Sequence, residues 1–173
     1  MKRILKNVIL SSVLTLVLYL LLAVVLLGGI ENQDVRFFIS SFVTVTISAS
    51  VLFYFQKCRK GIGEEELLSD YKKDRYDWQK EILFIWQRER SVVFFLFLIA
   101  VISFFANMMD HMILKMKLLS MITMVLFGPF TMLSSVIEIP FLGYTLSVFW
   151  ASVVYLLFVF LDRKRRYAYW MKK

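Results

Sequence analysis

The chain has 173 residues, of which 60% are hydrophobic and 17% are aromatic, and its mean hydropathy is +0.69. A soluble domain has roughly 45–50% apolar residues, so this composition excludes the soluble enzymes and soluble binding domains. The formal net charge of +8 suits a protein held at an anionic membrane surface.

Uncharged stretches indicate which parts of the chain lie in the membrane, because a spanning helix needs about 20 mainly apolar residues. Residues 8–30, 37–56 and 91–109 are uncharged runs of 23, 20 and 19 residues. Residues 118–161 form a run of 44, in which Glu138 is the single charged residue. A helix of that length would measure roughly 66 Å, about twice the thickness of the hydrocarbon layer, so this run must contain two membrane-embedded segments.

The distribution of Lys and Arg favours four crossings over five, since the cytoplasmic flanks of spans carry the excess of these residues. If every apolar segment crosses, the two sides carry 12 and nine basic residues; if 118–137 enters and leaves by the same face, they carry 18 and three. We therefore predict an all-α integral membrane protein of one domain, with both termini in the cytoplasm, in a cell membrane. Its expected elements are spans at 8–30, 37–56, 91–109 and 141–161, a re-entrant helical hairpin at 118–137, and one amphipathic cytoplasmic helix.

The hairpin turn is expected at Gly128 and Pro129, in the middle of the 118–137 segment. Proline lacks a backbone donor, clashes with the preceding helical turn and disfavours a helical residue before it. A hairpin at membrane depth must pack among the other helices, because irregular backbone there is tolerated only inside protein or beside a wet cavity. A full span with a proline kink is the alternative that these residues leave open.

The amphipathic helix is predicted at residues 64–90, which contain no glycine or proline and lead into the third span. The surrounding 57–90 loop has nine basic and eight acidic residues, so charge alone does not attach it to anionic lipid. It either lies in the membrane interface or docks against another protein. Its apolar stripe consists of Leu67, Tyr71, Trp78, Ile82 and Trp86.

Small and hydroxyl side chains recur every four residues on two of the spans. Such rows let helix backbones approach closely, and we expect helix packing within the chain, in a homo-oligomer, or with a membrane or cytosolic protein partner. A polar path for a substrate is the alternative. The rows are Ser40, Thr44 and Ser48 on the second span and Gly143, Ser147 and Ala151 on the last.

The tail at 162–173 carries six basic residues and one acid, interleaved with aromatic residues. Beside a span this pattern is explained by topology and by attraction to a lipid bilayer with an anionic inner leaflet. We therefore expect no nucleic acid as a partner.

Residues with catalytic or metal-binding chemistry are few. Cys58 and His111 lie on opposite sides of the predicted membrane and cannot form a nucleophile pair. No spacing typical of a metal site, phosphate loop or nucleophile elbow occurs, so no metal, cofactor or catalytic residue is predicted. Asp110, His111 and Glu138 converge at the predicted outer face and are candidates to bind an ion or relay a proton. Solvated loop residues are the alternative.

Three classes of function fit these features. The favoured one is a non-catalytic membrane subunit or regulator that acts through helix packing and the docking helix. A small transporter or channel subunit would use the hairpin as a pore element and Glu138 as its carboxylate. An intramembrane enzyme would have to rely on Asp110, His111 and Glu138.

Overall fold

The computed structural model describes residues 2–26, 33–57, 78–110, 118–135, 137 and 139–170, and no strand occurs within these residues. The expected all-helical class is therefore confirmed. The elements are α1 (Lys2–Leu26), α2 (Gln33–Lys57), α4 (Trp78–Met109), α5 (Leu118–Thr131), the 3-10 helix η2 (Met132–Ser135) and α6 (Pro140–Trp170).

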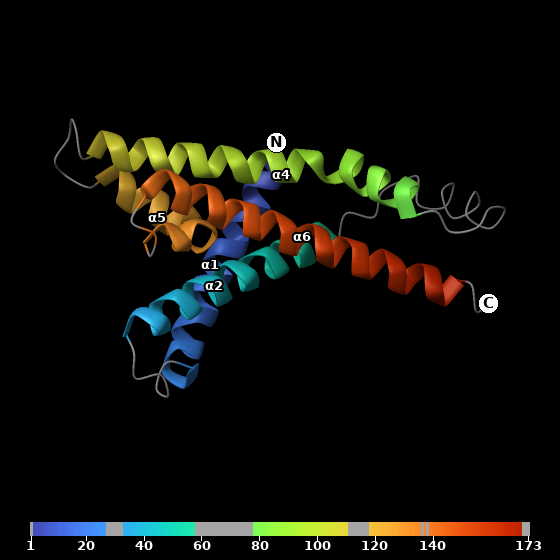
Figure 1. Ribbon diagram of the computed structural model, residues 1–173, viewed down its shortest axis with the longest axis horizontal. Coiled ribbons are helices and arrows are strands. Elements are labelled where there is room, and N and C mark those ends of the chain that lie inside the picture. The colour runs from blue at the N-terminus through green and yellow to red at the C-terminus, as the bar shows by residue number, and fades with distance from the viewer. Residues whose placement is uncertain are drawn as a thin grey trace.

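Two long antiparallel helices, α4 and α6, form one side of the molecule (Figure 1). At one end of this pair the start of α4 meets the end of α6 through Glu81 and Arg163. At the other end the rings of Phe104 and Phe141 lie 5.6 Å apart between centroids. The packing of apolar faces along this length makes α4 and α6 the frame of the fold.

Helix α2 runs in the same direction as α6 and packs on it. The ring of Phe42 contacts Trp150, and farther along both helices Phe53 stacks on Phe158 at 5.8 Å. Helix α1 pairs with α2, and this pair lies across the α4–α6 pair (Figure 1). Four crossings with a re-entrant 118–137 segment require α2 and α6 to run in the same direction, whereas five crossings would make them antiparallel.

The α5–η2 segment is short and packs against α1, α2, α4 and α6. It begins beside the end of α4 and leads back to the start of α6 at the same end of the frame (Figure 1). There the backbone of α6 approaches η2 so closely that a Cβ at Gly143 would lie 2.6 Å from the Cα of Ser134. Glycine is therefore the residue that this approach admits.

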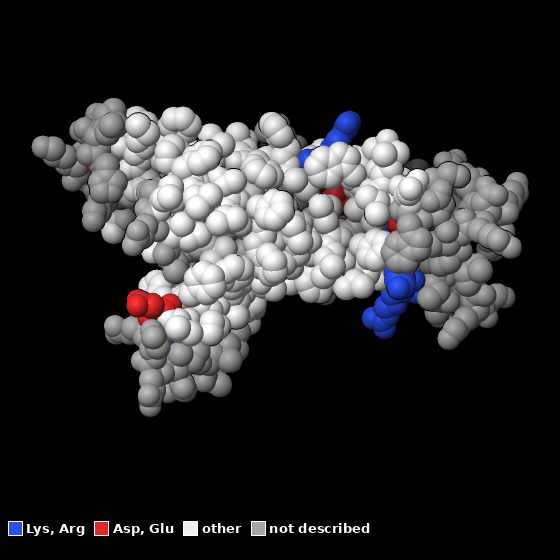
Figure 2. All heavy atoms as spheres, in the orientation of Figure 1, with Lys and Arg blue, Asp and Glu red and all other residues white. Residues whose placement is uncertain are grey.

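Within the described residues a hydrophobic cluster joins the helices, and its largest fully buried side chains include Tyr155, Phe130, Leu52 and Leu96. The outer surface is also apolar, with large exposed hydrophobic side chains on every described α-helix. Figure 2 shows this uncharged surface across the middle of the molecule. An apolar surface of this extent is unsuited to water and suited to lipid.

Three helices are long and apolar enough to cross a membrane: Asp34–Gln56, Glu81–Met109 and Phe141–Arg165. Two shorter apolar helical stretches, Ile4–Leu18 and Leu119–Ser135, accompany them within the described residues. The membrane class predicted from composition is thus supported by three candidate spans. The third span, expected to start at residue 91, belongs to a helix that begins at Trp78 without a break.

Candidate functional site at the α4–α6 contact

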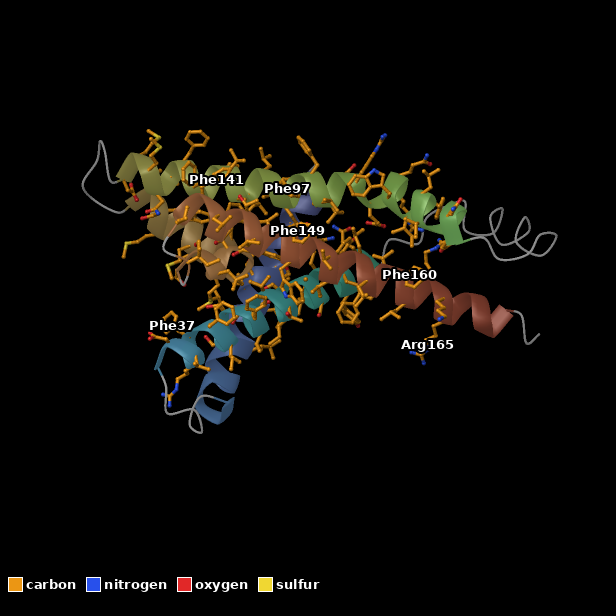
Figure 3. All side chains as sticks on the ribbon, viewed as in Figure 1. Phe37, Phe97, Phe141, Phe149, Phe160 and Arg165 are labelled. Atoms are coloured by element: carbon orange, nitrogen blue, oxygen red, sulfur yellow. The ribbon has the colours of Figure 1, made fainter. Side chains whose placement is uncertain are left out.

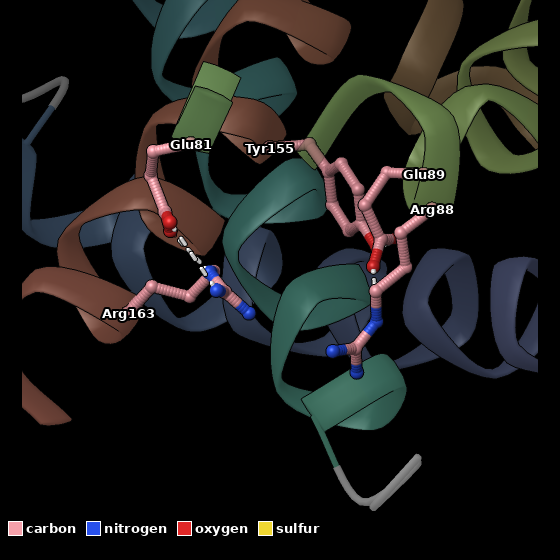
Figure 4. Close-up of polar contacts among 5 residues, drawn as sticks. All are labelled: Glu81, Arg88, Glu89, Tyr155 and Arg163. Atoms are coloured by element: carbon pink, nitrogen blue, oxygen red, sulfur yellow. Dashed lines mark hydrogen bonds and ion pairs between the residues drawn. The ribbon is translucent and has the colours of Figure 1, made fainter. Parts of the chain in front are cut away.

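Charged side chains are buried where the start of α4 meets the end of α6. The Arg163 guanidinium donates to both carboxylate oxygens of Glu81, with Nη2 3.3 Å from Oε2 (Figure 4). The Glu81 side chain is 4% exposed and the Arg163 side chain 17%. The guanidinium also lies 4.5 Å from the ring centroid of Phe84. A paired, bidentate arginine of this kind can remain charged in an apolar setting.

A second polar contact joins the same helices two turns farther along. The Tyr155 hydroxyl donates a 2.6 Å hydrogen bond to Glu89 Oε2, and Arg88 Nε lies 3.4 Å from Glu89 Oε1 (Figure 4). The two contacts are eight residues apart on both helices, so Glu89 lies roughly 12 Å along the axis from Glu81. We call Glu81–Arg163 and Glu89–Tyr155 together the α4–α6 clamp.

The clamp was not anticipated from the sequence, which assigned residues 64–90 to a cytoplasmic helix and the third span to 91–109. One signal for it is present. An acid at 81 and another at 89 match, on an antiparallel neighbour, a tyrosine at 155 and an arginine at 163. Equal spacing on two paired helices allows both contacts to form at once. This signal can be recognised only when the partner helix and its register are known.

Only part of the predicted docking stripe lies within the described residues. Trp78 is the first residue of α4, whereas Leu67 and Tyr71 lie outside the described residues. Ile82 and Trp86 are more than half exposed and stand on the part of α4 that runs beside α6. These two side chains therefore lie next to the clamp and not on a separate surface helix.

Of the three ion or proton candidates, only Asp110 lies within the described residues, so their convergence stays a prediction. Asp110 is 2% exposed and accepts hydrogen bonds from the backbone N–H groups of Leu119 at 3.2 Å and Ser120 at 2.6 Å. Its carboxylate thus caps the first turn of α5, a structural role that the sequence reading did not include. His111 and Glu138 lie outside the described residues.

The expected turn at Gly128 and Pro129 is displaced along the chain. Both residues lie inside α5, which ends at Thr131 and continues as η2 to Ser135. The Thr131 hydroxyl lies 3.4 Å from the carbonyl oxygens of both Phe127 and Gly128. Pro129 has no N–H to bond the carbonyl of residue 125, so it weakens the helix two residues before α5 ends.

All six residues of the predicted packing rows are buried. Their hydroxyls bond to carbonyls of their own helix: Thr44 to Ser40 at 2.7 Å, Ser48 to Thr44 at 2.8 Å and Ser147 to Gly143 at 2.8 Å. Such internal bonds leave a compact, low-polarity surface at which helices can approach. The arrangement favours packing over a hydrated path along these rows.

No group of three or more His, Cys, Asp or Glu side chains suited to a metal ion occurs within the described part of the chain. Comparison with protein-family models, with curated proteins and with solved structures gives no match. The function must therefore be inferred from the geometry of the chain itself.

Proposed function

We propose that the chain is a non-catalytic multi-pass membrane subunit or regulator. It acts through helix packing and through a docking segment at the start of α4, which engages a membrane or cytosolic protein. The single observation that carries this proposal is the α4–α6 clamp on an unbroken helix.

The clamp links a docking event to the membrane body. Helix α4 runs from Trp78 to Met109 without interruption, and two buried polar contacts fix its first three turns to α6. A displacement at Trp78 is therefore passed to α6 and to the α2 face packed on it, because close-packed helices move as bodies.

The topology that we propose has four crossings, both termini in the cytoplasm and α5–η2 as a re-entrant segment. It is supported by the shared direction of α2 and α6, and by the position of both ends of α5–η2 at one end of the frame. The packing of this segment among the other helices also meets the requirement for short helices at membrane depth.

Co-purification from native membranes tests the docking role. We expect Trp78→Ala to lose the proteins that accompany the wild-type chain, while Phe105→Ala, an exposed aromatic on the same helix, retains them. Equal retention by both variants would count against the proposal. Expression level and detergent stability are the controls for folding.

A transporter or channel subunit is the second candidate, and Glu89 is the observation that favours it. This acid is 8% exposed inside the candidate span Glu81–Met109, and ionisable groups within spans commonly mark ion or proton pathways. Purified protein in liposomes would then carry an ion or proton flux that Glu89→Gln alters and Asp34→Asn does not. A wild-type protein without flux would remove this candidate.

A further inference from the structure

An apolar groove runs between α4 and α6 beside the clamp. Its volume is about 400 Å³, and its lining is almost wholly apolar and has no charged side chain. The lining residues are Ile82, Ile85, Trp86, Val153, Leu156, Leu157 and Phe160.

The groove is elongated along the helix axes at the end of the frame where the basic residues gather. From Val153 to Phe160 it extends roughly 10 Å, which is within the roughly 15 Å depth of one leaflet of the hydrocarbon core. Its α6 stripe continues one turn beyond Phe160 into Arg163 and Lys164. Lys164 is exposed on this stripe, whereas Figure 3 shows Arg165 on the side of α6 that faces away from α4.

Charge and chemistry together select the occupant. Both carboxylates of the clamp are paired internally, with Arg163 and with Tyr155 and Arg88, and Lys164 places a cation at the end of the groove's α6 stripe. An acyl chain has no polar group to satisfy against an apolar lining, whereas a partner backbone or polar side chain would. Tryptophan at such a level is typical of the membrane interface.

We infer that this groove is a binding site for an anionic phospholipid, with one acyl chain along α4 and α6 and the phosphate beside Lys164. The site belongs to the folded chain alone and does not depend on the docking partner. Bound lipid fills the gap between two helices that the clamp holds at one edge, and so stabilises their pairing.

Native mass spectrometry of the purified full chain tests this site, with phosphatidylglycerol and phosphatidylcholine as the probes. We expect phosphatidylglycerol to be retained preferentially. Val153→Phe fills the groove and should abolish that preference, while Leu146→Phe, an exposed position two turns away on α6, should leave it intact. Lys164→Gln should weaken retention about fivefold, the effect of one cation near anionic lipid, whereas Lys6→Gln should not.

Three results would overturn the inference. One is equal retention of the two lipids by the wild-type chain. Another is equal behaviour of Val153→Phe and Leu146→Phe. The third is a photo-crosslinker at Leu157 that yields a protein adduct in native membranes and no lipid adduct. Loss of a docking partner in Trp78→Ala with lipid retention unchanged would leave the site standing, so the two proposals fail separately.

Discussion

Tyr155 shows how one hydroxyl holds an acid inside an apolar helix pair. The side chain is fully buried, its ring packs near Phe53 at 6.4 Å between centroids, and its hydroxyl bonds to Glu89. A buried carboxylate is tolerated only when paired or hydrogen-bonded. The apolar ring of Tyr155 therefore packs in the core while its hydroxyl satisfies the Glu89 carboxylate.

Tyr155→Phe should lower the free energy of unfolding by about 1–3 kcal/mol, because it removes a donor from a buried acceptor and leaves the ring in place. Tyr144→Phe is the matched control, since it keeps the ring contact with Phe104. Denaturation in mild detergent measures both. Equal stability of the two variants would show that the Glu89 contact contributes little.

Gly143 and Gly128 give a paired test of close approach. A Cβ at Gly143 meets the Cα of Ser134 at 2.6 Å, whereas at Gly128 it meets the flexible Met124 side chain at 3.3 Å. Gly143→Ala should therefore destabilise the chain by about 1–3 kcal/mol through forced backbone movement.

Gly128→Ala should be nearly neutral, because alanine favours helix by up to about 1 kcal/mol and Met124 can yield. Thermal unfolding of both variants checks this. A larger loss at Gly128 than at Gly143 would contradict the packing of η2 on α6.

At the scale of elements, α5 depends on a cap that comes from the preceding helix. Asp110 follows the last residue of α4 and holds two backbone donors at the start of α5, which leaves the short helix anchored to the end of α4. This anchor holds the start of α5 beside the end of α4, and the close approach at Gly143 holds η2 against the start of α6. The two contacts together support the re-entrant arrangement that we propose.

Asp110→Ala should lower stability by about 1–2 kcal/mol, the usual loss for a removed helix cap. Asp110→Asn should retain most of it, because the amide oxygen still accepts a hydrogen bond. Hydrogen exchange of the α5 amides is the sharper measurement, and we expect faster exchange in the alanine variant. Unchanged exchange in α5 would show that the cap does not hold this helix.

The limits of residue patterns are visible in these same elements. Hydropathy located the starts of α2, α5 and α6 to within four residues, because uncharged runs mark where apolar helices begin, whereas α6 continues nine residues past the predicted end at 161. The turn was predicted at Gly128 and Pro129, but α5 continues for two residues beyond the proline before it ends. The packing of η2 on α6 determines whether the chain turns at Pro129 or after residue 131, and that contact is not local in sequence.

At the scale of the whole molecule, contacts between distant segments carry most of the information about function. In the clamp, Glu81 and Arg163 are separated by 82 positions in the chain, and Glu89 and Tyr155 by 66. The lipid groove also draws its lining from both helices. The sequence analysis counted the acids at 81 and 89 only among the eight acidic residues of the 57–90 loop. Their burial depends on the register of α4 against α6, which composition and periodicity do not define.

The proposed topology depends on the direction in which each helix crosses the membrane. In it, α1 and α2 cross in opposite directions and α2 and α6 in the same direction, so the start of α1 and the end of α6 lie on one side. Fluorescent-protein and alkaline-phosphatase fusions after Lys173 measure this directly, with the same reporters before Met1 as the reference. We predict a fluorescent, phosphatase-inactive C-terminal fusion on the same side as the N-terminus. A phosphatase-active C-terminal fusion opposite a cytoplasmic N-terminus would contradict the account.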